Sequence, residues 1–115
     1  MIKIYIASPY TIGDVAVNVK TQLDAADILM NNGFAPFTPL YSHFQHMAHP
    51  RDYHDWINLD LEWITVCDCL IRLEGKSSGA DGEVAHAIKL GIPVFFATLD
   101  TLEMEITNIK KYFNL

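Results

Sequence analysis

Residues 67–97 decide the predicted fold, and they read CDCLIRLEGKSSGADGEVAHAIKLGIPVFFA. Residues 67–73 form a nearly continuous apolar run, which is typical of a strand that is buried on both faces. A polar loop with several glycines follows over residues 74–82, and residues 83–90 predict a helix. Residues 92–97 are apolar again and predict a second strand. A strand, a helix and a strand in this order predict a parallel pair of strands, because a helical crossover returns the chain to the same end of the sheet.

The rest of the chain continues the alternation of strands and helices. The other expected elements are a strand at residues 2–6, a helix over residues 15–30 capped by Asp14 and ended by Asn32 and Gly33, a strand over residues 34–38, a helix over residues 55–66 and a helix over residues 102–113. Residues 40–53 show no clear period and predict a long loop or a broken helix. We therefore expect residues 1–115 to form a single α/β domain. Its mostly parallel, doubly wound sheet would be Rossmann-like or flavodoxin-like, with helices on both faces.

Composition narrows the class of partner. The formal net charge is −6 and lysine and arginine do not cluster, so binding to long nucleic acid is not expected. No apolar run approaches the length of a membrane span, and the first residues do not resemble a signal peptide. Cys67 and Cys69 would point to opposite faces of a strand and remain free thiols. These features predict a cytoplasmic protein without a membrane partner.

Ligands of open parallel sheets bind beyond the carboxyl ends of the strands, which selects the loops at residues 7–13, 39–53 and 74–82. In the third loop, glycines let the backbone approach a ligand, and Ser77 and Ser78 offer hydroxyl groups. With the N–H groups of the following helix, they would form a cradle for a phosphate. The spacing matches neither the P-loop nor the dinucleotide-binding fingerprint, and an ordinary glycine-rich turn explains it equally well.

Two carboxylates are candidates for acid–base and nucleophilic chemistry. Glu83 is expected in the first turn of its helix, where the dipole favours the ionised form, and an ionised carboxylate can attack the anomeric carbon of a sugar. Simple complementarity to the helix dipole is the alternative explanation. Asp60 lies in an otherwise apolar stretch, where partial burial would raise its pKa and keep a proton available. Alternatively, Asp60 faces solvent beside Glu62.

His43, His46 and His49 are spaced three residues apart, which would suit a metal site. We do not predict one, because the segment is irregular and no cysteine lies near it. No cofactor is expected either. These histidines, His43 in particular, line a base or sugar pocket or stay solvated. Four aromatic residues would either stack on a base or pack in the core: Tyr41, Phe44, Trp56 and Trp63.

Three strings of residues are familiar as an ordered set: YIASPY at residues 5–10, DLEW at residues 60–63 and SSGADGE at residues 77–83. In their order and spacing, they resemble the nucleoside 2-deoxyribosyltransferase superfamily, which includes the 2′-deoxynucleoside 5′-monophosphate N-glycosidases. The resemblance extends over nearly the whole chain. The sequence also resembles small uncharacterised bacterial and phage relatives in this superfamily.

The resemblance implies a nucleophilic role for Glu83, and a role for Asp60 at the sugar and in protonation of the leaving base. It further implies that the 5′-phosphate is held at Ser77 and Gly79, next to the candidate Ser78, and that the first loop wraps the sugar and phosphate through Ser8, Pro9 and Tyr10. Members of the superfamily are commonly homodimers or larger, so we expect a homo-oligomer. The first loop here lacks the glycine and arginine typical of the monophosphate hydrolases, which leaves the substrate open.

The leading hypothesis is cleavage of the N-glycosidic bond of a nucleoside or its 5′-monophosphate, by hydrolysis or by deoxyribosyl transfer. A non-catalytic nucleotide-binding sensor of the same fold is the alternative from another class. A third hypothesis is cleavage of NAD, for which this short chain offers little room.

Overall fold

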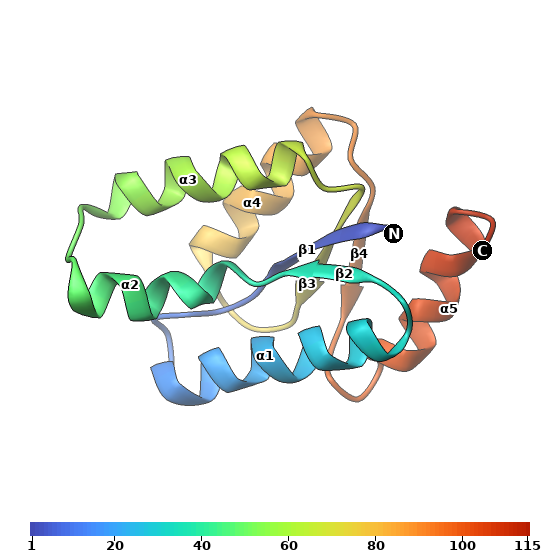
Figure 1. Cartoon of the computed structure of the whole chain (residues 1–115), viewed down its shortest axis with the longest axis horizontal. Helices are drawn as coiled ribbons and strands as arrows, with labels where there is room; N and C mark the ends of the chain where they lie inside the picture. Colours follow the sequence, from blue (N-terminus) through green and yellow to red (C-terminus); the bar gives the residue numbers. More distant parts are fainter.

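The computed structural model describes residues 1–115 (Figure 1). Four strands alternate with helices along the chain. In order, the elements are β1 (Lys3–Ala7), α1 (Val15–Asn31), β2 (Ala35–Phe37), the 3-10 turn η1 (Pro39–Tyr41), α2 (Ser42–Ala48), α3 (Tyr53–Thr65), β3 (Cys69–Leu73), α4 (Ser78–Lys89), β4 (Val94–Ala97) and α5 (Leu102–Tyr112).

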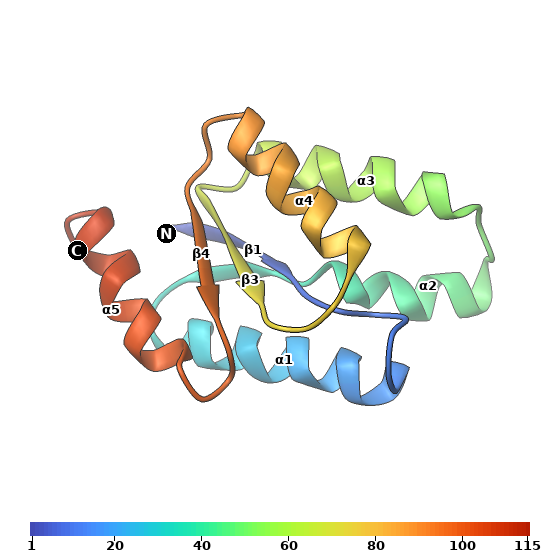
Figure 2. The same ribbon diagram turned by 180° about the vertical axis from the view of Figure 1, so that it is seen from behind.

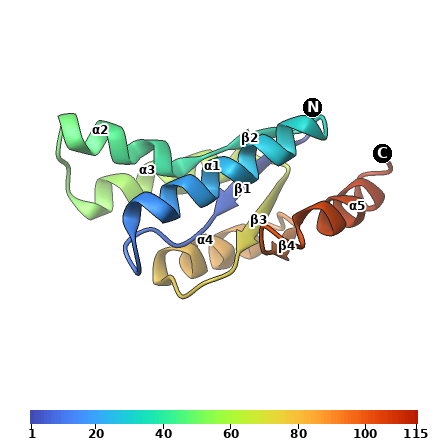
Figure 3. The ribbon, with the colours of Figure 1, turned by 90° about the horizontal axis from the view of Figure 1, so that it is seen from below.

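The strands form one sheet in the order β2-β1-β3-β4, and every pair is parallel. The predicted single α/β domain with a parallel sheet is therefore confirmed. Helices cover both faces, as predicted: α3 and α4 lie side by side on one face, and α1 lies on the other (Figure 2). The turn between α2 and α3 projects from the end of the molecule opposite to both termini (Figure 3).

The alternation of side chains along β1 explains why there are two cores. Ile4 and Ile6 face α1 and α5 and belong to the larger core, whereas Tyr5 and Ala7 face α3 and α4 and belong to the smaller one. All four side chains are fully buried. Tyr5 thus places a hydroxyl group within the smaller core.

The first helix ends as its sequence predicts. Gly33 has a φ of +85°, the left-handed conformation that glycine adopts without strain, and its N–H donates to the carbonyl of Met30.

The cysteines also behave as predicted. Both are free and buried, with Cys67 in the smaller core and Cys69 in the larger.

The predicted start of α4 changes, whereas one of the two alternatives for residues 40–53 is confirmed. The helix α4 begins at Ser78 and not at Glu83, because the Ser77 hydroxyl caps it by accepting from the N–H of Ala80. Glu83 consequently lies in the second turn, and its expected place in the first turn is wrong. The irregular segment at residues 40–53 is a broken helix, made of η1, α2 and a short connection to α3. No helix combines the length and apolar character needed to cross a membrane.

Candidate active site

A cavity of about 450 Å³ opens beyond the carboxyl ends of the strands, within the size range of small-molecule sites. Its walls come from the loop after β1, from η1 and α2, from α3 and from the start of α4. Eight of the nine predicted site residues line it: Ser8, Tyr10, His43, Asp60, Ser77, Ser78, Gly79 and Glu83. Pro9 does not. It packs instead against Gly75, where a Cβ would lie 2.7 Å from the Pro9 Cγ.

Glu83 lines this cavity and is only 8% exposed. The Tyr5 hydroxyl, from the middle of β1, donates a hydrogen bond to its Oε2. Burial raises the pKa of Glu83 to about 8; the Asp60 charge adds to the rise, while the Tyr5 hydrogen bond and the Arg72 charge oppose it. The carboxyl group is therefore held by burial in a readily protonated state, contrary to the ionised state expected from the helix dipole.

Asp60 lines the same cavity from α3 and is half-buried. Burial raises its pKa to about 7. Burial alone raises the pKa of Asp60, and the Asp60 charge adds to the rise in the pKa of Glu83, so both carboxyl groups have pKa values near neutral pH. Near pH 7 such a pair can hold one proton and one negative charge, which suits it to combined acid and nucleophile chemistry.

Burial also affects the tyrosines at the site. The pKa of the Tyr5 hydroxyl is raised far above its ordinary value, chiefly by burial and then by the charge of Glu83. Tyr5 therefore keeps its proton and can donate it to the Glu83 carboxylate. Burial likewise raises the pKa of Tyr10. The sequence did not mark Tyr5 as a site residue, although it lies in one of the strings that carry the family resemblance.

Arg72 shapes the loop that leads into α4. Its guanidinium is buried and donates to the carbonyls of Leu73 and Gly75, the latter at 2.8 Å, and to Asp81 Oδ1 at 2.9 Å. These three contacts fix the turn between β3 and α4. Ser78 and Gly79, the first two residues of α4 after this turn, line the cavity.

Gln22 fixes the first loop in a similar way. This residue of α1 is fully buried, and its Nε2 donates to the carbonyl of Ile6 at 3.1 Å and to Ser8 Oγ at 2.8 Å. Its Oε1 accepts from the N–H of Leu40 at 3.0 Å. The side-chain amide thus ties Ser8 to the start of η1. Its only sequence signal was a polar residue on the buried face of a helix.

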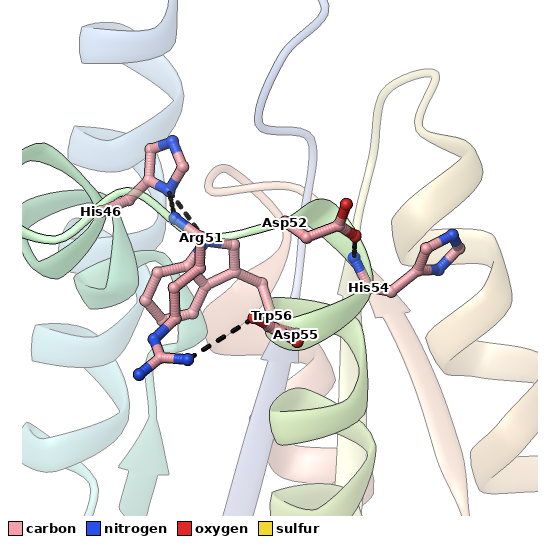
Figure 4. Close-up of polar contacts among 6 residues, drawn as sticks. All are labelled: His46, Arg51, Asp52, His54, Asp55 and Trp56. Carbon is pink, nitrogen blue, oxygen red and sulfur yellow. Dashed lines mark hydrogen bonds and ion pairs between the residues drawn. The ribbon is translucent and has the colours of Figure 1, made fainter.

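Helix α2 forms the outer wall and buries none of its own residues. His43 Nδ1 lies 2.5 Å from the Tyr10 hydroxyl, in the first loop. His46 Nδ1 accepts from the indole N–H of Trp56 at 2.9 Å and from the N–H of Arg51 at 3.2 Å (Figure 4). The two histidines therefore tie α2 to the walls on either side. No group of three His, Cys, Asp or Glu residues is arranged to hold a metal ion.

The four aromatic residues considered from sequence lie in different surroundings. Trp56 lines the cavity, whereas Tyr41 and Phe44 are exposed and lie outside it. Trp63 stacks on Phe37 at the side of the sheet. Of the four aromatic residues considered from sequence, only Trp56 is placed to contact a ligand in the cavity.

Comparisons with known proteins give a matching family and a similar solved structure. Residues 2–97 match a family described as a domain of unknown function (DUF7768). A search of curated proteins finds no match. Among solved structures, the chain is similar to a 2-deoxyribosyltransferase from the psychrotolerant bacterium Bacillus psychrosaccharolyticus. The TM-score is 0.60 with 25% sequence identity, over 82% of this chain and 70% of the other.

Proposed function

We propose that this chain, which belongs to the family described as a domain of unknown function (DUF7768), cleaves the N-glycosidic bond of a nucleoside or a nucleoside 5′-monophosphate. The observation that carries this proposal is that the carboxyl groups of Glu83 and Asp60 line one cavity, with Glu83 hydrogen-bonded to Tyr5. The similarity to a 2-deoxyribosyltransferase supports the reaction class.

In the first step, a carboxylate oxygen of Glu83 attacks C1′ of the sugar. The bond between C1′ and the base nitrogen breaks, its electron pair goes to the base, and the base takes a proton from Asp60. Since Tyr5 occupies Oε2 of Glu83, Oε1 is the free oxygen for attack. The products of this step are the free base and a glycosyl ester of Glu83.

In the second step, a water molecule or a second base attacks C1′ and loses its proton to the Asp60 carboxylate. The C1′–O bond to Glu83 breaks, and the Glu83 carboxylate is restored. Water as the acceptor gives hydrolysis, and a base gives deoxyribosyl transfer. In the first step, the positive charge that develops on the sugar favours the ionised form of Glu83, so the proton of the pair moves from Glu83, which has the higher pKa, to Asp60 before it reaches the base.

The start of α4 supports recognition of a 5′-phosphate. Ser77, Ser78 and Gly79 line the cavity together with Lys76, so hydroxyl groups, helical N–H groups and one cation lie within reach of an anion. On this arrangement, we expect a nucleoside 5′-monophosphate to be a better substrate than the nucleoside.

The test is chromatographic detection of free base after incubation with ribo- and deoxyribonucleosides and their 5′-monophosphates, with and without a second base as acceptor. We expect base release by the wild type and none by Glu83→Ala. Glu62→Ala, an exposed carboxylate on α3, is the matched control and should retain activity. Ligand binding without any base release would overturn the proposal in favour of a nucleotide sensor.

A further inference from the structure

Three aromatic rings form a continuous stack that ends at Glu83. The rings of Trp63 and Phe37 lie 5.0 Å apart between centroids, with an angle of 23° between their planes. Those of Phe37 and Tyr5 lie 5.6 Å apart with an angle of 27°. The stack thus runs from α3 through β2 to β1, and the hydroxyl at its inner end donates to Glu83 Oε2.

The sheet register explains why the inner two rings meet. Tyr5 and Phe37 are paired across β1 and β2, so their side chains leave the sheet on the same face and lie next to each other. Both belong to the smaller core or pack against it. Since Tyr5 is fully buried, its ring can turn or tilt only if its neighbours move.

Trp63 is the outer member, and its position is less easily explained by stability alone. It is 45% exposed, so it is not an ordinary core residue. It also follows Asp60 by three residues on α3, which places both side chains on neighbouring positions of one helical face. The same segment of helix therefore carries Asp60 and the ring that covers the stack.

We infer that Trp63 is a positioning residue for the Glu83 carboxylate, acting through the rings of Phe37 and Tyr5. The inference rests on the proposed function, in which Glu83 is the nucleophile. Stacked rings favour particular offsets and spacings, so removal of the outer ring lets the inner two shift and weakens the Tyr5 hydrogen bond. Trp63 itself does not line the cavity and would not contact the substrate.

The consequence is a specific change in the titration of Glu83. Three groups act on this carboxyl: Tyr5 from β1, Asp60 from α3 and Arg72 from β3. Of these, only Tyr5 is hydrogen-bonded to it, and that bond lowers its pKa. Loss of the stack should therefore raise the pKa of Glu83, while a residue that only stabilises the fold should leave it unchanged.

The experiment compares Trp63→Ala, Trp63→Leu, Trp63→Phe and Tyr5→Phe with the wild type. Leu59→Ala is the control, because Leu59 is 43% exposed on the same helix and outside the stack. For Trp63→Ala and Trp63→Leu, we expect kcat about tenfold lower with KM nearly unchanged. Glu83, followed by carboxyl 13C NMR, should titrate at higher pH in both, as in Tyr5→Phe. Trp63→Phe, which keeps a ring, should restore wild-type behaviour.

The NMR titration separates the two proposals. If the wild type releases no base, the proposed function fails, yet a shifted Glu83 titration in Trp63→Leu and a normal one in Trp63→Phe would still support the positioning role. An unshifted Glu83 titration in a folded Trp63→Leu variant would overturn the inference. So would equal effects of Leu59→Ala and Trp63→Leu on kcat.

Discussion

The Tyr5 hydroxyl on β1 donates a hydrogen bond to Oε2 of Glu83 on α4, across 78 positions of sequence. Both groups are buried, so the bond is protected from water. It opposes the rise in the pKa of Glu83 that burial and Asp60 cause. A phenol that can hardly ionise therefore holds the carboxylate that we propose as the nucleophile.

Substitution Tyr5→Phe removes this donor and keeps the ring. Since the hydrogen bond lowers the pKa of Glu83, its loss should move the acidic limb of the pH profile of kcat/KM upward by about one pH unit. Activity near neutral pH should fall about tenfold. Steady-state kinetics across pH measure both effects. Tyr112→Phe, at an exposed tyrosine of α5, is the control; an unmoved acidic limb in Tyr5→Phe would contradict the assignment.

The raised pKa of Glu83 also predicts how stability depends on pH. Its pKa is 4.5 as an ordinary glutamate and about 8 in the folded protein, so folding favours the protonated form. This stabilising preference is complete below about pH 4.5 and is lost as the pH rises through 8. Glu83→Gln, which stays neutral, should therefore be more stable than the wild type above pH 8, by on the order of 2–4 kcal/mol. Urea unfolding at several pH values measures the difference, and it should be absent for Glu62→Gln.

We expect Arg72 to contribute to the stability of the folded protein. Replacement Arg72→Met leaves the carbonyls of Leu73 and Gly75 without their donor, so we expect a loss of about 2–4 kcal/mol in the free energy of unfolding. The partner change Asp81→Asn should cost less than about 1 kcal/mol, because the Asp81 side chain is 72% exposed. Denaturant unfolding of both variants tests this order, and equal losses would contradict it.

Replacement of Gly75 and of Gly82 by alanine should have opposite effects on stability. Gly75 has a φ of +120°, and an added Cβ would lie 2.7 Å from Pro9 Cγ, so Gly75→Ala should destabilise the protein by about 1–3 kcal/mol and raise KM by displacing the first loop. Gly82 lies within α4 with open space around it, so Gly82→Ala should stabilise by about 0.5–1 kcal/mol. Thermal unfolding and kinetics of the pair provide the comparison.

The attachment of α2 depends on its histidines. His46→Ala removes the acceptor for Trp56 and for the N–H of Arg51, so hydrogen exchange of the α2 amides should become about tenfold faster. His54→Ala is the matched control. The His54 N–H is capped by Asp52, and the substitution keeps that N–H (Figure 4). Equal exchange rates in the two variants would show that His46 does not hold α2.

The sequence predicted the layered fold well because apolar periodicity and glycine stops are local signals. It misplaced the start of α4, because Gly79 and Gly82 look like loop residues until Ser77 is seen to cap the helix. Along α1, Val17 is exposed and Gln22 is buried, so apolar residues alone do not mark the buried face of this helix. The buried hydrogen bonds of Gln22 depend on β1 and η1, which no window along α1 can reveal.

The two carboxylates were found from sequence, whereas their environment was not. Glu83 and Asp60 stand out as acids beside a glycine-rich loop and within an apolar helix. The hydrogen bond from Tyr5 was hidden, since a tyrosine in an alternating strand looks like any other buried aromatic residue. Only the register that pairs β1 with β2 and β3 sets that hydroxyl under α4.

The exposure of the α2 side chains affects how related proteins can differ in sequence. Because it buries none of its residues, its side chains can be exchanged with little loss of core packing. Glu83 and Tyr5 lack this freedom, since both are enclosed by the sheet and its helices. A chain built this way can acquire a new ligand preference through changes in α2 while the surroundings of Glu83 and Tyr5 stay constant.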